Sequence, residues 1–188
     1  KLLQTAEIVF HDALVDPAML DYCSQAILIP VGKRCGRHSA AQSFINKRLI
    51  DASRKYKHIV RLKGGDPMIF GRADEEITAL ESSGVDVEVV PGITAALAAS
   101  ASLKQSLTLR GVSRSVAFYT QVKAENEQEA SLPNADTLVI YMGRSNSVQL
   151  AEQLLSQGRP KNTPVQIIES ISTLKERSLA LTLDEMSQ

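Results

Sequence analysis

The sequence lacks the features of secreted proteins, of proteins with a structural metal site and of membrane proteins. Its two cysteines, Cys23 and Cys35, are too few for a disulfide framework or a metal-ligand set. No apolar run approaches the roughly 20 residues that span a bilayer, and no signal-peptide pattern opens the chain. We therefore expect a soluble, cytoplasmic protein with no metal and no membrane partner.

An excess of charge of one sign is also missing. Lys and Arg together number 21, and so do Asp and Glu, which gives a formal net charge of zero. A chain with no net positive charge has no overall attraction for nucleic acid. Any functional role of its basic residues must therefore come from a local cluster of them. The chain also lacks the Gly-x-Gly-x-x-Gly turn of nicotinamide-binding dehydrogenases, which disfavours that class of enzyme.

Short β-rich runs alternate with helical patterns in the first half of the chain. We expect strands at residues 7–10, 26–31, 58–62 and 85–90, and helices at residues 17–23, 39–56, 72–83 and 94–103. Such alternation is typical of βαβ units, in which the strands form a parallel sheet. The fold class is therefore α/β.

The periodicity lapses between Leu103 and Ser113, and we place a domain boundary there. The first α/β domain would cover residues 1–104 and the second residues 105–188. In the second domain we expect strands at residues 115–120, 137–142, 164–169 and 176–183, and a helix at residues 146–157. Neither end of the chain carries a complete helix pattern, so we expect a fragment with terminal segments missing.

Residues that contribute little to folding follow each expected strand of the first half. Asp12 follows the first strand, residues 32–38 the second, residues 64–67 the third and residues 92–94 the fourth. In a parallel sheet these loops share one edge, so the four segments should converge on a single ligand site.

Each of these segments also has a simpler interpretation. Asp12 and Thr94 can cap helices, and Gly-Gly-Asp-Pro can be a plain turn. The cations of residues 33–37 can be a solvated surface cluster. Convergence at one edge favours the shared site, and the Pro-Gly turn before Thr94 leaves backbone N–H groups at a helix start for a ligand.

Three blocks of sequence match a known family. They are Gly-Lys-Arg-x-Gly-x-His at residues 32–38, Arg-Leu-Lys-Gly-Gly-Asp-Pro-x-Ile-Phe-Gly-Arg at residues 61–72, and Val-Val-Pro-Gly-Ile-Thr-Ala at residues 89–95. With these blocks in this order, the chain closely resembles the uroporphyrinogen-III C-methyltransferases of the tetrapyrrole methylase family.

The resemblance implies a two-domain tetrapyrrole methylase fold, with an N-terminal parallel sheet and a C-terminal mixed sheet, each with helices. It implies S-adenosyl-L-methionine as the cofactor in a cleft between the domains, no metal, and a homodimer. The implied reaction is C-methylation of uroporphyrinogen III at two ring carbons. Its product, precorrin-2, serves sirohaem or cobalamin synthesis.

The resemblance also implies roles for individual residues. Asp12 matches the family's proton acceptor and Lys33 its proton donor. Cofactor contacts would come from Gly64, Gly65, Asp66, Ile69, Thr94, Ala95 and Met142. The substrate is a tetrapyrrole that carries many carboxylates, and arginine pairs well with carboxylates. Candidate substrate-binding residues are Arg34, Arg37, His38, Arg72 and Arg110.

The second half departs from the family pattern at several positions. These are residues 104–106, Leu109, Gln121, Val122 and Ile171. Two alternatives therefore stay open: a methylase of a later corrin precursor, or a non-catalytic paralogue that acts as a binding or dimerisation module.

Overall fold

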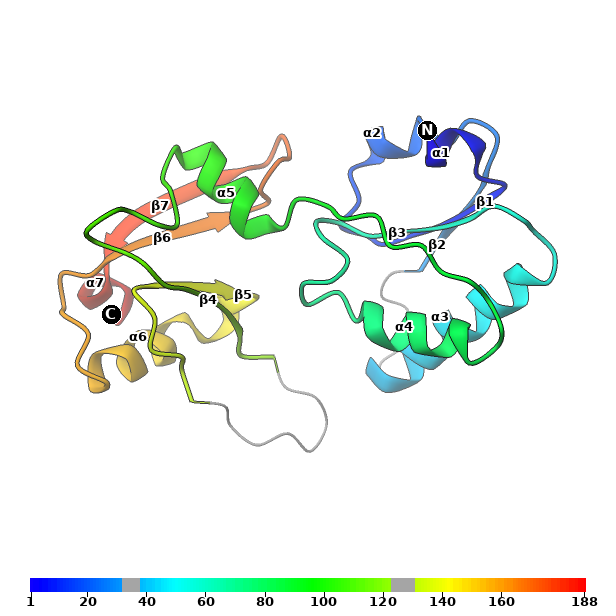
Figure 1. Ribbon diagram of the computed structural model, residues 1–188. Coiled ribbons are helices and arrows are strands. Elements are labelled where there is room, and N and C mark those ends of the chain that lie inside the picture. Colours follow the sequence, from blue (N-terminus) through cyan, green and yellow to red (C-terminus); the bar gives the residue numbers. More distant parts are fainter. Residues whose placement is uncertain (32–37, 123–130) are drawn as a thin grey trace. The chain divides into compact units, whose positions relative to one another are not determined.

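The computed structural model describes residues 1–31, 38–122 and 131–188, with residues 38–41 described by their backbone only (Figure 1). The chain forms two compact units, Lys1–Thr94 and Ala95–Gln188. Helix α5 (Ala95–Leu103) therefore groups with the second unit, whereas the boundary expected from the sequence lies after it. The lapse in periodicity marks the end of this helix, and its contacts decide to which unit it belongs.

A three-stranded parallel sheet forms the centre of the first unit. Strand β1 (Ile8–His11) lies between β2 (Ile27–Pro30) and β3 (Ile59–Leu62). Phe10 stands opposite Ile29 on one side and Arg61 on the other. The strands expected at residues 7–10, 26–31 and 58–62 and their parallel direction are confirmed, so the described residues that follow β1 and β3 lie at one edge of the sheet.

The central strand is buried on both faces. Side chains alternate along a strand, so neighbouring residues of β1 belong to different clusters. One cluster joins Ile8 and Phe10 to α3 (His38–Ser53) through Leu49 and Ala52; the other joins Val9 to Ala6 and Cys23. Each fully buried large side chain of this kind contributes about 1.5–3 kcal/mol. This burial fixes the positions of the strand ends.

Three shorter helices complete the first unit: α1 (Leu2–Thr5), α2 (Pro17–Leu20) and α4 (Ala73–Glu81). Helix α2 begins where Asp16 Oδ1 accepts the backbone N–H of Ala18 at 2.9 Å. After α4, Gly84 takes a left-handed φ of 76°, as expected for a glycine that follows a helix. The helices expected at residues 17–23 and 72–83 are therefore present, although both are shorter than expected.

The prediction of a strand at residues 85–90 is wrong. The segment pairs with no strand of the described structure, and Val89 and Val90 are 41% and 52% exposed. Its alternating Val-Asp-Val-Glu pattern has the strand period, but a strand also needs a neighbouring edge to which it can hydrogen bond. The pattern alone could not supply that neighbour.

The second unit contains both strand directions, but they lie in two separate two-stranded sheets and not in one mixed sheet. Strands β4 (Val116–Thr120) and β5 (Thr137–Tyr141) pair in parallel, and β6 (Pro164–Glu169) and β7 (Arg177–Thr182) pair antiparallel. A 3₁₀ turn, η1 (Gly143–Asn146), leads into α6 (Ser147–Ser156), and α7 (Leu183–Met186) follows β7. A capping box between Thr182 and Glu185 starts α7.

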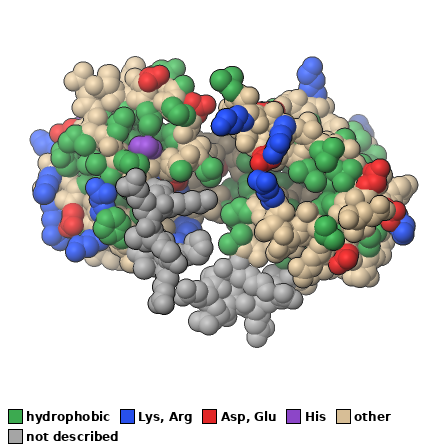
Figure 2. All heavy atoms as spheres, turned by 180° about the vertical axis from the view of Figure 1, so that it is seen from behind, with side chains coloured by type: hydrophobic (Ala, Val, Ile, Leu, Met, Phe, Trp, Pro, Cys, Tyr) green, Lys and Arg blue, Asp and Glu red, His purple; other side chains and the backbone are tan. Residues whose placement is uncertain are grey.

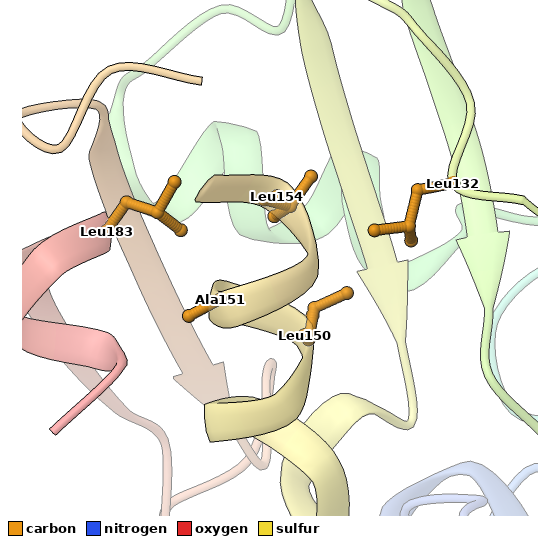
Figure 3. Packing of buried hydrophobic residues seen from close by; sticks show 5 residues of the cluster. All are labelled: Leu132, Leu150, Ala151, Leu154 and Leu183. Atoms are coloured by element: carbon orange, nitrogen blue, oxygen red, sulfur yellow. The ribbon is translucent and has the colours of Figure 1, made fainter. Parts of the chain in front are cut away.

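Helix α6 supplies three of the five buried residues in the hydrophobic cluster of the second unit (Figure 3). Leu150 points to the side of α6 on which Leu132 lies, and Ala151 to the side on which Leu183 of α7 lies (Figure 3). The cluster consists of Leu132, Leu150, Ala151, Leu154 and Leu183. The α6 members are spaced as residues on one helical face. This packing supports β5, from which the candidate residue Met142 follows.

Many apolar side chains remain exposed, as the face of each unit drawn in Figure 2 shows. Leu14, Val112, Ile93 and Leu174 are among the large apolar side chains exposed by 70% or more. Within the described ranges, no helix has both the length and the apolar character needed to cross a bilayer.

Candidate functional site

The loops that follow β1 and β3 touch each other. The backbone N–H of Asp12 donates to the carbonyl of Leu62 at 3.3 Å. A methyl group placed on Gly64 would lie 3.1 Å from the Cβ of Leu14. Asp12 and the double glycine therefore lie at the same edge of the sheet, where the sequence analysis placed them.

A third loop joins this edge through Asp66. Its Oδ2 accepts the backbone N–H of Gly92 at 2.9 Å, and its Oδ1 accepts that of Met68 at 2.8 Å. Gly65 has a left-handed φ of 79°, and a methyl group on Gly92 would lie 2.3 Å from the Gly65 carbonyl oxygen. The backbone angle therefore favours glycine at Gly65, and the close approach leaves no room for a side chain at Gly92.

The Asp12 carboxylate is held by one cation. Its Oδ1 accepts from Nη2 of Arg61 at 2.5 Å, and the Asp12 side chain is 28% exposed. Arg61 is only 13% exposed, and its Nη1 also donates to the carbonyls of Phe10 and Leu62. Asp12 thus combines a fixed, charge-assisted hydrogen bond with access to solvent.

A second carboxylate lies behind this pair. Glu76, on α4, is 5% exposed; its Oε1 lies 3.2 Å from Nε of Arg61, and both its oxygens lie 3.2 Å from Nζ of Lys63. The pKa of Lys63 is lowered, first by burial and then by the Arg61 charge, while the Glu76 and Asp12 carboxylates act in the opposite direction. Arg61, Lys63 and Glu76 therefore form a largely buried charge cluster, and Asp12 is its most exposed neighbour.

The sequence analysis missed the roles of Arg61, Lys63 and Glu76. One available signal was Arg61 itself, a charge inside the apolar run of β3. Another was Glu76, which falls at helical spacing between the apolar residues Ala73 and Leu80. A charge at a position expected to be buried indicates a partner nearby.

Arg72, a candidate for substrate binding, forms an ion pair with Glu75. Its Nε and Nη2 donate to the two carboxylate oxygens of Glu75 at 2.6 and 2.7 Å. This hydrogen bonding raises the pKa of Arg72 and lowers that of Glu75. The arginine has a left-handed φ of 55°, so its side chain is presented from a strained backbone position.

In the second unit, candidate residues come together at the start of α5 and the end of β5. The hydroxyl oxygen of Tyr141 accepts the backbone N–H of Ala96 at 3.2 Å. Ala95 precedes this contact, and Met142 follows Tyr141 with a φ of 58° and 56% exposure. Tyr141 thereby ties the backbone around Ala95 to the backbone around Met142.

The remaining predicted residues are placed less closely or lie outside the described residues. Ile69 donates its N–H to the Asp66 carbonyl at 3.4 Å, Thr94 is 6% exposed, and Arg110 is exposed in the loop after α5. Lys33, Arg34 and Arg37 fall outside the described ranges, and His38 is described by its backbone only. Among the side chains that the structure describes, no three His, Cys, Asp or Glu residues form a group able to hold a metal ion.

Comparison with known proteins shows to which family this chain belongs. Residues 1–187 match the family model of the Tetrapyrrole (Corrin/Porphyrin) Methylases. The chain belongs to this family. The resemblance inferred from the three sequence blocks is thereby confirmed.

Individual tetrapyrrole methylases are similar over nearly the whole chain. The chain is 40% identical to the uroporphyrinogen-III C-methyltransferase of Pseudomonas aeruginosa, covering 99% of itself and 77% of that protein. It is 42% identical to the siroheme synthase of Tolumonas auensis, of which it spans 41% of the length.

A solved structure supports the fold. The Thermus thermophilus uroporphyrin-III C-methyl transferase, complexed with S-adenyl homocysteine, superposes with a TM-score of 0.86 at 36% identity. The superposition covers 99% of this chain and 76% of the other. The two-unit tetrapyrrole methylase fold expected from the sequence is confirmed.

Proposed function

We propose that this protein is an S-adenosyl-L-methionine-dependent methyltransferase that converts uroporphyrinogen III to precorrin-2. The observation that carries the proposal is the placement of Asp12. Its carboxylate, held at 2.5 Å by Arg61, lies at the same sheet edge as the Gly64–Gly65–Asp66 turn. Relatives similar over almost the whole chain include a uroporphyrinogen-III C-methyltransferase and a siroheme synthase.

The residues of this edge fit the cofactor. Gly64, Gly65 and Gly92 are exposed; a side chain at Gly92 would collide with the Gly65 backbone, and one at Gly64 would be in tight contact with Leu14. A ligand can therefore approach main-chain groups closely there. We assign cofactor binding to Gly64, Gly65, Asp66, Ile69, Thr94, Ala95 and Met142.

When bound, the cofactor supplies an activated methyl group on a sulfonium centre. The protein's main contribution is then to position the reactants. C-methylation of a pyrrole must be accompanied by loss of a proton, and Asp12 accepts it, with Lys33 as the proton donor of the family pattern.

Local cations suit a substrate rich in carboxylates. We assign its binding to Arg34, Arg37, His38, Arg72 and Arg110. Arg72 already makes a two-point contact with the Glu75 carboxylate, and this geometry is the one that a substrate carboxylate would use. A substrate group would have to displace Glu75 or share the arginine with it.

The direct test is a product analysis of the full-length gene product. Incubation with uroporphyrinogen III and S-adenosyl-L-methionine should give S-adenosyl-L-homocysteine and a tetrapyrrole that carries two added methyl groups. Because each transfer releases a proton, this product is heavier than the substrate by two CH2 units. Methylation of a later corrin precursor, without methylation of uroporphyrinogen III, would favour the second enzyme hypothesis.

Calorimetry with S-adenosyl-L-homocysteine separates both enzymes from a non-catalytic module. Such a module should show neither heat of binding nor a shift in melting temperature. We also propose a homodimer, which light scattering of the same sample would test.

A further inference from the structure

Arg61 lies between two carboxylates that have different surroundings. Its Nη2 donates to Asp12 at 2.5 Å, and its Nε donates to Glu76 at 3.2 Å. Asp12 is 28% exposed, whereas Glu76 is 5% exposed. One carboxylate can meet a ligand, and the other faces the interior.

Glu76 is itself fixed from a second direction. Its Oε1 accepts from Nε2 of Gln42 on α3 at 3.0 Å. The same Gln42 nitrogen donates to Asn46 at 2.9 Å, and Asn46 donates to the carbonyl of Glu75 at 3.1 Å. Helices α3 and α4 therefore hold the Glu76 carboxylate in place beneath the end of β3.

The planar guanidinium makes this arrangement directional. Its donors have a fixed geometry, so an acceptor at Nε restricts the direction in which Nη2 can point. The Phe10 and Leu62 carbonyls hold Nη1. Only Glu76 accepts from Nε among the hydrogen bonds of the described residues.

We propose that Glu76 is a positioning residue for Asp12: it orients Arg61, which holds one oxygen of the Asp12 carboxylate and leaves the other to accept the substrate's proton. This inference rests on the proposed function, which makes Asp12 the proton acceptor. Among the described residues, no hydrogen-bond donor contacts Oδ2 of Asp12.

A simpler role for Glu76 is to neutralise Lys63, whose Nζ contacts both of its oxygens. Removing Glu76 alone would leave Lys63 buried without its carboxylate partner, and the loss of stability would hide any effect on position. The two roles are separated by removing Lys63 first and Glu76 second.

The test compares Lys63→Met with Lys63→Met/Glu76→Met in the full-length protein. The double variant removes one charge of each sign, and such a swap of a buried pair for apolar residues is often tolerated. Its kcat should be about 10- to 100-fold below that of Lys63→Met, because small misplacements of reacting groups have effects of this size. The KM for uroporphyrinogen III and the affinity for S-adenosyl-L-homocysteine should differ by less than about threefold.

Two variants sharpen the comparison. Asp74→Asn removes an exposed carboxylate from the same helix and should leave kcat unchanged. Lys63→Met/Glu76→Gln retains an oxygen that can accept from Nε, so its kcat should lie above that of Lys63→Met/Glu76→Met. Equal kcat values for Lys63→Met and Lys63→Met/Glu76→Met would overturn the inference.

Nitrogen-15 NMR of Arg61 gives a readout that does not depend on turnover. Its Nε–H should be protected from exchange in Lys63→Met and unprotected in Lys63→Met/Glu76→Met. An equally protected Nε–H in both would also overturn the inference, whether or not the parent protein methylates. A parent that binds no S-adenosyl-L-homocysteine and gives no product would instead count against the proposed function.

Discussion

Gly92 donates its backbone N–H to Oδ2 of Asp66 at 2.9 Å, across 26 residues of sequence. The same glycine approaches the Gly65 carbonyl so closely that a Cβ atom would lie 2.3 Å from that oxygen. The turn after β3 and the loop before α5 are therefore in such close contact that there is no room for a side chain at Gly92.

Gly92→Ala should separate the two loops, because an added methyl group cannot stay 2.3 Å from a backbone oxygen. We expect a loss of about 1–3 kcal/mol of stability and at least about tenfold weaker binding of S-adenosyl-L-homocysteine by calorimetry. Gly158→Ala is the control: its φ of 87° strains an alanine, but nothing lies within 4 Å. The control should lose stability and keep its affinity; an unchanged affinity in Gly92→Ala would contradict the prediction.

Asp12→Asn should leave S-adenosyl-L-homocysteine binding within about threefold of the parent and lower kcat by about 10²- to 10⁴-fold, since an amide is a poor proton acceptor. Turnover with uroporphyrinogen III and calorimetry measure the two effects separately. The control is Asp16→Asn, because asparagine caps α2 as well as aspartate does. Full turnover in Asp12→Asn would remove Asp12 from the mechanism.

Tyr141→Phe should loosen the start of α5, because the Ala96 N–H loses its acceptor at 3.2 Å. An unsatisfied buried donor costs about 1–3 kcal/mol, and the Ala96 amide should exchange faster with solvent. Tyr22→Phe, at a tyrosine that is 57% exposed, is the matched control. Unaltered exchange at Ala96 would show that the tyrosine does not hold this helix.

Asp136 should make the second unit sensitive to acid. Its Oδ2 accepts from the backbone N–H groups of Arg114 and Ser115 at 2.9 and 3.0 Å. These bonds, with that of Arg114 first, lower the pKa of Asp136 below its usual 3.8. The folded form therefore binds this proton less readily than the unfolded form. The stabilisation is complete above pH 3.8 and is lost as the pH falls through the lower, folded-state value.

Asp136→Asn should accordingly reduce stability near neutral pH and flatten its decline in acid. Urea unfolding from pH 7 down to about pH 3 measures this slope. Glu152→Gln, at an exposed position of α6, should keep the parent's slope. A variant at Asp136 with the parent's slope would show that these hydrogen bonds do not persist in solution.

The shared sheet edge could be predicted because it follows from local patterns. The apolar runs that end at Phe10 and Leu62 show which residues follow each strand. Because the two strands pair in parallel, the residues that follow them lie at the same edge of the sheet. The segment at residues 85–90 shows the limit, since its pattern was that of a strand but its partner was not encoded in the pattern. Whether residues 85–90 form a strand depends on whether another strand offers a free edge for hydrogen bonding, and the local pattern does not contain that information.

The buried charge cluster was beyond sequence reasoning for a related reason. Arg61 and Glu76 lie 15 residues apart, on a strand and a helix whose relative placement decides whether they meet. A buried charge indicates that a partner exists, but only the packing of α4 beside β3 shows which one. The roles assigned to Asp12 and to the other site residues stay predictions, and Lys33, Arg34 and Arg37 also lie outside the described ranges.

The left-handed backbone at Arg72 and Met142 has a consequence for engineering. Each residue holds a conformation, at φ 55° and 58°, that costs roughly 1–2 kcal/mol for residues other than glycine. Glycine at either position would relieve this strain and delete the side chain that we assign to ligand binding. Directed evolution that selects only for heat resistance should therefore drift towards glycine at these sites and yield hardier, inactive proteins.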